Sequence, residues 1–195
     1  MHTFKNKNKK SITVFHNLAS IIPLHVFRKT PKVTFLKINQ VIHHLGSIDQ
    51  VNHATGAKSP MIPNDPVHYW YMHRYQKDQL IVHKGVRIVE LYSKKHGRKE
   101  TFEVSRHWIK HNGKIIFKGT GLLCWPAYVF HRIYSPNGSI STNYAKHAKG
   151  FSMKNNFNIY DLDFLSGKYR VVRKGFIDQN ITENIIGLDD DNKSY

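Results

Sequence analysis

The stretch that decides the fold begins with Tyr71-Met72-His73 and continues through Asp78 to Gly85. Much later the chain reads Pro126-Ala127-Tyr128-Val129-Phe130-His131, followed by Ser135. As spacings these runs are His-x4-Asp-x6-Gly and Pro-x4-His-x3-Ser. Both runs are rich in aromatic and β-branched residues, which is typical of strands.

Side chains on a strand alternate between its two faces. Tyr71 and His73 therefore share one face, as do Val129 and His131 on the later strand. If both strands belong to one closed sheet, His73, Asp78 and His131 come together inside it, with Tyr71 beside them. The sequence thus predicts a single polar cluster made from two distant motifs.

Strand signals follow one another from Val67 to Ala145, in short apolar runs separated by Gly, Asn or Pro. Asn112-Gly113 and Asn137-Gly138 are dipeptides that favour tight hairpin turns. Many short strands at this spacing indicate an antiparallel sandwich or barrel. We expect a mainly β protein.

The two runs together resemble the two-motif signature of the cupin superfamily. His73 stands at the second histidine of the first motif, Asp78 at the acidic position, and Pro126 and His131 match the second motif. Tyr71 stands where the family has its first histidine. The resemblance implies an RmlC-like, antiparallel cupin-like β-barrel (jelly roll) and a homodimer.

Two imidazoles and one carboxylate form an open set of ligands for a divalent transition metal such as Fe, Mn, Ni or Zn. We therefore expect a metal site at His73, Asp78 and His131, in a metal-dependent enzyme of the oxygenase or isomerase type. Some members of the family work without metal as sugar-nucleotide epimerases or isomerases. In that alternative Tyr71, His73 and His131 are the catalytic residues. A third interpretation is a polar core without catalytic function.

Three regions are expected along the chain. Residues 1–66 form a basic N-terminal extension and loop that can contribute strands to the sheet. Residues 67–150 form the barrel core, and 151–195 the C-terminal strands and acidic tail. Within the first region we expect a loose tail over residues 1–10, a short helix within Ser11–Val26, a strand over Val33–Ile38 and an irregular loop over 46–66. Asn158–Leu162 and Tyr169–Arg173 are predicted strands.

The chain of 195 residues carries a formal net charge of +17 and has a sequence pI near 9.9. Such a charge suits an anionic partner, and a small anionic molecule is the favoured one. A nucleic acid is the alternative, because aromatic side chains can stack on bases while Lys and Arg neutralise phosphates. A dispersed, solvated basic surface is the third interpretation.

The remaining features concern compartment and cysteine chemistry. No apolar run approaches the roughly 20 residues that a membrane helix needs. We expect an intracellular, cytoplasmic protein, with organelle targeting by the basic N-terminus as the alternative. Cys124, the single cysteine, lies in an apolar run and is expected to be buried and inert.

Overall fold

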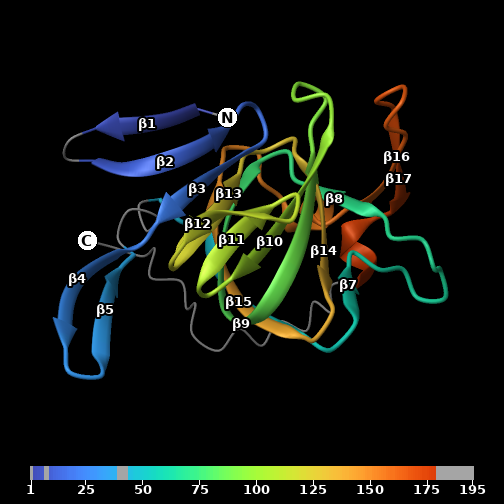
Figure 1. The fold of residues 1–195 in the computed structure, drawn as a ribbon. Coiled ribbons are helices and arrows are strands. Elements are labelled where there is room, and N and C mark those ends of the chain that lie inside the picture. Colours follow the sequence, from blue (N-terminus) through green and yellow to red (C-terminus); the bar gives the residue numbers. More distant parts are fainter. Residues whose placement is uncertain (1, 7–8, 39–43, 179–195) are drawn as a thin grey trace, which may run out of the picture.

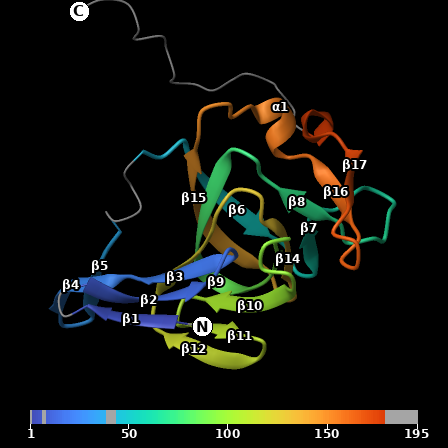
Figure 2. The ribbon, with the colours of Figure 1, turned by 90° about the horizontal axis from the view of Figure 1, so that it is seen from above.

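The computed structural model describes residues 2–6, 9–38 and 44–178. Fifteen strands form one antiparallel sheet that folds over on itself, as Figures 1 and 2 show, and the hairpin β4 (His25–Thr30) and β5 (Val33–Lys37) stands apart from it. The mainly β, antiparallel fold class predicted from sequence is confirmed.

The long strand β9 (Gln76–Tyr92) belongs to both halves of the folded sheet. Its first part pairs with strands of one half, which contains β1 (His2–Asn6), β2 (Lys9–Phe15), β3 (Ala19–Pro23), β13 (Gly121–Trp125), β15 (Ser139–His147) and β6 (Ser47–His53).

The second part of β9 pairs with β10 and β14 in the other half. That half contains β12 (Lys114–Lys118), β11 (Trp108–His111), β10 (Lys99–Ser105), β14 (Phe130–Ser135), β7 (Ala57–Ser59), β8 (Trp70–Met72), β16 (Ile159–Leu162) and β17 (Tyr169–Arg173). A short helix α1 (Met153–Asn156) and a 3-10 helix η1 (Gly175–Asp178) complete the described chain.

Gly85 lies where β9 passes from one half to the other. Its φ of +75° is a conformation that side chains with a Cβ rarely adopt. A Cβ at this position would lie 2.2 Å from the carbonyl oxygen of Gly138, in the neighbouring turn. The glycine of the first sequence motif therefore serves the close approach of two backbones at the bend.

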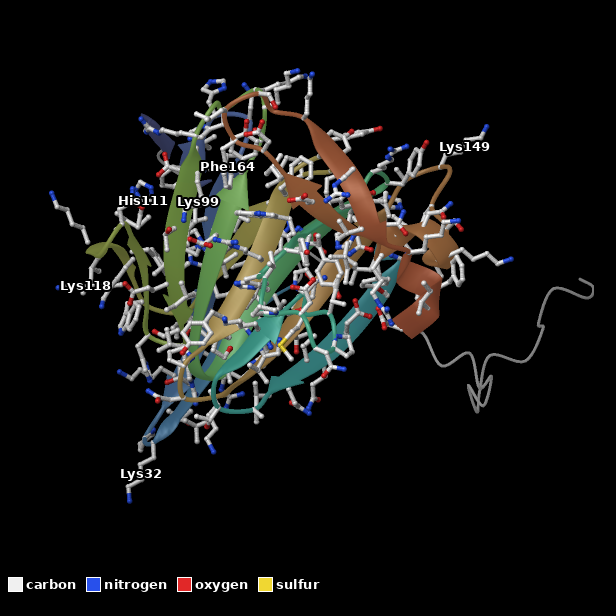
Figure 3. All side chains as sticks on the ribbon, turned by 90° about the vertical axis from the view of Figure 1, so that its right-hand side faces the viewer. Lys32, Lys99, His111, Lys118, Lys149 and Phe164 are labelled. Carbon is white, nitrogen blue, oxygen red and sulfur yellow. The ribbon has the colours of Figure 1, made fainter. Side chains whose placement is uncertain are left out.

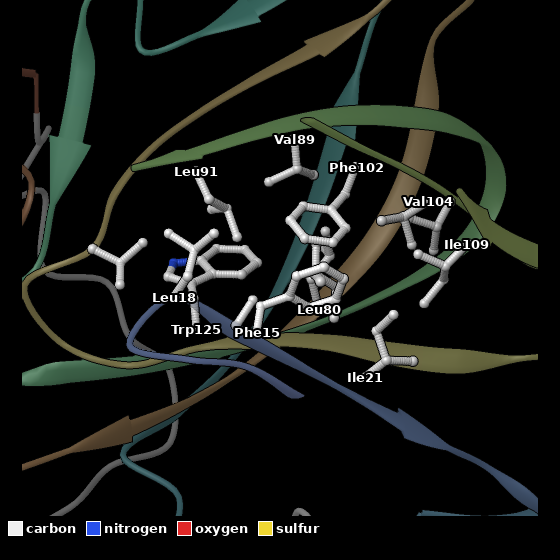
Figure 4. Close-up of a cluster of buried hydrophobic side chains, with 14 residues drawn as sticks. Phe15, Leu18, Ile21, Leu80, Val89, Leu91, Phe102, Val104, Ile109 and Trp125 are labelled. Carbon is white, nitrogen blue, oxygen red and sulfur yellow. The ribbon is translucent and has the colours of Figure 1, made fainter. Parts of the chain in front are cut away.

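The main apolar core fills one side of the space between the two halves (Figure 4). Phe102 and Val104 of β10 lie there against Leu91 and Leu80 of β9, and all four are at most 2% exposed. Burial of each such side chain contributes about 1.5–3 kcal/mol. The core thus holds the two halves together and leaves the other side of the barrel for polar residues.

The predicted helix within Ser11–Val26 is wrong. Phe15 ends β2, Asn17 adopts a φ of +57° in a turn, and β3 starts at Ala19. Ile21 then pairs with Leu123 of β13 and is 1% exposed. The apolar spacing fits a helix locally, but pairing with an edge of the barrel sheet buries the same residues as strands.

Two predicted irregular segments also contain strands. The residues expected to form a loose tail contribute β1 and the start of β2, which pair with each other. The predicted loop over 46–66 contains β6 and β7, which pair with β15 and β14. Long-range pairing partners explain both errors, because short polar strands carry little signal of their own.

Several local predictions are confirmed. Asn112 and Gly113 have φ values of 46° and 79° in the turn between β11 and β12, and Gly138 has a φ of 74° before β15. Val33 begins strand β5, and the two predicted C-terminal strands are β16 and β17. The acidic tail lies outside the described residues.

Basic side chains project in different directions from the molecule. Lys32, Lys118 and Lys149 extend from well-separated parts of it in Figure 3. Over the described residues, no helix is long and apolar enough to cross a membrane. Cys124 is buried, and burial raises the pKa of its thiol to about 12, which fits the predicted inert cysteine.

Glu100 is a buried carboxylate that fixes the edge of β10. Oε1 accepts hydrogen bonds from His96 Nε2 at 3.0 Å and Arg98 Nε at 2.6 Å. Oε2 accepts from His111 Nε2 at 2.7 Å and Asn112 Nδ2 at 3.0 Å. Burial alone raises the pKa of Glu100, but these four donors lower it to about 2.

Replacing Glu100→Gln is expected to destabilise the protein at neutral pH. The carboxylate contributes stability above its ordinary pKa of 4.5, and this contribution is lost as pH falls toward 2. A shift of this size corresponds to about 3 kcal/mol. Chemical unfolding of both proteins between pH 7 and pH 3 tests this prediction. The difference between their free energies of unfolding should narrow below pH 4.5, and a constant difference would contradict it.

Candidate functional site

His73 follows β8 and turns its ring into the barrel. It is 5% exposed, and its Nδ1 lies 2.6 Å from the carbonyl oxygen of Asn156, the last residue of α1. A carbonyl only accepts hydrogen bonds, so Nδ1 carries the proton. In the neutral ring the lone pair is therefore on Nε2, which lies 3.8 Å from Oδ2 of Asp78.

His131 comes from β14 and lies beside His73, with ring centroids 4.8 Å apart. Its Nδ1 is 3.3 Å from the carbonyl oxygen of Val129, so its Nε2 is again the free nitrogen. Burial, followed by the charge of His73, lowers the pKa of His131 to about 4. His131 is therefore neutral at physiological pH.

Asp78 near the start of β9 has one satisfied and one unsatisfied oxygen. Oδ1 accepts hydrogen bonds from Gln76 Nε2 at 2.7 Å and Asn143 Nδ2 at 2.8 Å. Oδ2 is buried and has no hydrogen-bond partner. A buried acceptor without a partner costs free energy, so this oxygen is an acceptor that the protein leaves open inside the barrel.

Tyr71 lies beside both imidazoles, as the alternation of side chains along the strand predicts. The planes of the Tyr71 and His73 rings are inclined by 19°, and the ring centroids are 6.2 Å apart. The centroid of the Tyr71 ring is 5.9 Å from that of His131. Burial raises the pKa of Tyr71, and the charge of Asp178 raises it further. The phenol consequently keeps its proton at neutral pH and can donate it.

These residues line one cavity of about 160 Å³ inside the barrel. Trp125 and Phe157 provide apolar walls, with Trp125 5.2 Å from the His131 ring and Phe157 5.5 Å from the His73 ring. The volume is below the roughly 300–1,000 Å³ of pockets that enclose a drug-sized ligand. A group no larger than a monosaccharide fits this space.

The structure thus brings Tyr71, His73, Asp78 and His131 together. Ser135, at the end of the second motif, instead bonds to His53 at 2.9 Å. Sequence reasoning missed other lining residues. Gln76 could have been found, because it shares a strand face with Asp78. The others come from segments without a motif: Asp49, Val51, His53, Ser59, Arg87, Asn143 and Phe157.

The three predicted metal ligands offer donor atoms within 4.8 Å of one another. Donors bonded to one ion at about 2.0–2.2 Å lie no more than about 4.4 Å apart. The donor set is chemically suited to a divalent metal, with both Nδ1 atoms held by carbonyls as in many metal sites. The largest distance between the donor atoms exceeds the limit for a single ion by only a few tenths of an ångström.

No family model matches the chain, and no curated protein matches it in sequence. Solved structures do match. The dTDP-4-dehydrorhamnose 3,5-epimerase of Sulfolobus tokodaii has a TM-score of 0.49 and 14% identity, over 87% of this chain and 85% of its own.

Two further matches are a dTDP sugar isomerase and a sugar 3,4-ketoisomerase. The isomerase, from Desulfovibrio desulfuricans G20, has a TM-score of 0.48 and 15% identity, over 68% of this chain and 80% of its own. The ketoisomerase, from Thermoanaerobacterium thermosaccharolyticum, also has a TM-score of 0.48, and it has 10% identity over 69% of this chain and 84% of its own. For all three structures the likeness concerns the fold alone.

The substitution Asp78→Asn is expected to stabilise the protein. The amide keeps Oδ1 as acceptor for Gln76 and Asn143, and its NH₂ replaces the unpartnered Oδ2 with a donor facing Nε2 of His73. Removing a buried unsatisfied acceptor gains about 1–2 kcal/mol. Thermal unfolding measures this change. The control is Asp161→Asn, because the Asp161 carboxylate lies outside the cavity and pairs with Arg170. A loss of stability would show that Oδ2 already has a partner.

Proposed function

We propose that the protein is an acid–base enzyme that moves a proton next to the carbonyl group of a small, sugar-like molecule, without a metal. The observation that carries this proposal is the unpartnered Asp78 Oδ2, 3.8 Å from the free Nε2 of His73. A carboxylate at this distance stabilises the imidazolium that forms when His73 accepts a proton.

His73 is the base in this reaction. The C–H bond next to the carbonyl breaks, its proton goes to Nε2 of His73, and its electron pair forms the double bond of an enol. The carbonyl oxygen takes a proton from the hydroxyl of Tyr71. A proton delivered to the former carbonyl carbon gives an isomer, and one delivered to the same carbon from the opposite face gives an epimer. In both cases the enol hydroxyl proton that is released returns to Tyr71. His131, which stays neutral, orients the substrate through Nε2.

The cavity supports a sugar-sized substrate. Trp125 and Phe157 offer apolar faces, while the imidazoles and Tyr71 offer polar groups that can bond to hydroxyls. Two of the structural neighbours are named as enzymes that act on dTDP-linked sugars. A sugar ring fits a space of about 160 Å³, and a nucleotide attached to it would remain outside the cavity.

A metal enzyme is the second candidate. Two unprotonated Nε2 atoms and a buried carboxylate oxygen without a partner form a donor set for Fe, Mn, Ni or Zn. A bound ion would polarise a substrate carbonyl as a Lewis acid. His73, Asp78 and His131 would hold it, and their side chains would have to draw together to do so.

Solvent proton exchange tests the proposed reaction. We expect a dTDP-4-keto-6-deoxy sugar incubated with the protein in D₂O to gain deuterium, as measured by mass spectrometry. Substitution of a general acid or base typically costs 10²–10⁴-fold, so His73→Ala and Tyr71→Phe should slow exchange by about that much. His83→Ala is the control, because His83 bonds to Thr142 away from the cavity.

The same assay separates the two candidates. Protein treated with a chelator should exchange at an unchanged rate if the acid–base proposal holds. Loss of exchange on chelation, restored by one of the four metals, would establish the metal enzyme instead. Absence of exchange with and without metal, across keto sugars with and without a nucleotide, would remove the proposed function.

A further inference from the structure

Arg87 of β9 lies in the wall of the same cavity and is one of the largest fully buried side chains. It is 2% exposed. Its Nε donates to Oγ of Ser139 at 3.0 Å, and its Nη2 donates to the carbonyl oxygen of Val51 at 3.0 Å. Both acceptors are neutral, and a guanidinium keeps its charge in proteins.

No carboxylate neutralises this charge within the described part of the chain, where Arg87 forms no ion pair within 4.0 Å. The two acids that line the cavity form their hydrogen bonds with neutral side chains and none with Arg87. Asp49 accepts a hydrogen bond from Ser47, and Asp78 accepts from Gln76 and Asn143. A buried charge without a counter-charge is costly, which is why such groups are usually paired.

The groups around Arg87 form a hydrogen-bonded chain that ends at His53. Ser139 Oγ lies 2.8 Å from Ser135 Oγ, which lies 2.9 Å from Nδ1 of His53. Ser139 accepts from Arg87, so the arrangement that uses both hydroxyl protons has Ser139 donating to Ser135 and Ser135 donating to His53. Nε2 of His53 then carries a proton and is a second donor beside Arg87.

Arg87 and His53 are separate from the catalytic group. Burial, followed by the charge of Arg87, lowers the pKa of His53 to about 4. The charges that act on His131 are instead those of His73 and Asp78. One cavity thus contains a proton-transfer end and a cationic end.

We propose that Arg87 binds a carboxylate or phosphate group of the substrate, so that the molecule converted in this cavity is an anionic keto sugar or a related oxo acid. This inference rests on the proposed function, which assigns the keto group of the substrate to the side of the cavity that contains His73. It adds that the anionic group enters the barrel itself. Arg87 is suited to this because its planar fork matches the two oxygens of a carboxylate or phosphate.

Binding of small probes tests this without turnover. Inorganic phosphate, D-glucuronate and neutral D-glucose are titrated into the wild-type protein by calorimetry. We expect phosphate or glucuronate to bind and glucose to bind more weakly than either. A preference for phosphate indicates a phosphorylated substrate, and a preference for glucuronate a carboxylate. Failure of both anions to bind at millimolar concentration would overturn the proposal.

Matched variants identify the residue. Arg87→Met, which removes the charge at similar volume, should weaken binding of the preferred anion by about 10- to 100-fold, the usual effect of a lost charge-assisted contact. Arg87→Lys should retain part of the affinity. Arg106→Met is the control for net charge, because Arg106 is exposed. Equal affinity in Arg87→Met and wild type would mean that Arg87 only holds β6 and β15 to β9.

A measurement on the wild-type protein covers the case in which Arg87→Met does not fold. Because Arg87 lowers the pKa of His53, a bound anion should raise it, and NMR titration of the His53 ring with and without the preferred anion measures this. An unchanged titration would contradict the proposal. The variant His73→Ala should bind the anion as tightly as the wild type. Anion binding by Arg87 can therefore be established even if the proton-exchange assay fails.

Discussion

The bend of β9 at Gly85 is the constraint on which the site depends. One strand serves both halves of the sheet, so residues nine positions apart, Asp78 and Arg87, line the same cavity. The bend requires the φ of +75° at Gly85 and its close approach to Gly138. The neighbouring strands β14 and β15 pair with the second and first parts of this strand, and they bring His131 and Asn143 to the cavity.

Two costly buried groups, the carboxylate of Asp78 and the guanidinium of Arg87, line the hollow part of the barrel. The apolar core occupies one side of the interior, and Glu100 at its edge has four donors on its two oxygens. Asp78 and Arg87 instead keep an open oxygen or an unpaired charge beside the cavity. A protein retains such costly groups where a ligand can complete them, and for this reason both proposals start from these two residues.

The sequence predicts the site better than it predicts the edges of the fold. Tyr71, His73, Asp78 and His131 could be placed together because strand alternation and two ordered motifs constrain them. The N-terminal strands could not be predicted, since β3 forms through pairing with β2 on one side and the distant β13 on the other. Asn156 could not either, because its carbonyl reaches His73 from 83 positions away. Arg87 reads as an ordinary basic residue until its burial is known.

Both candidate reactions depend on two imidazole nitrogens that face the cavity with their lone pairs. Nitrogen-15 NMR of the histidine rings at neutral pH reads the tautomers directly, with His73→Gln and His131→Gln providing the assignments. The structure predicts that both rings carry their proton on Nδ1, which bonds to a carbonyl oxygen, and a lone pair on Nε2. A proton on Nε2 of His73 at neutral pH would leave no base facing the substrate and would contradict the account.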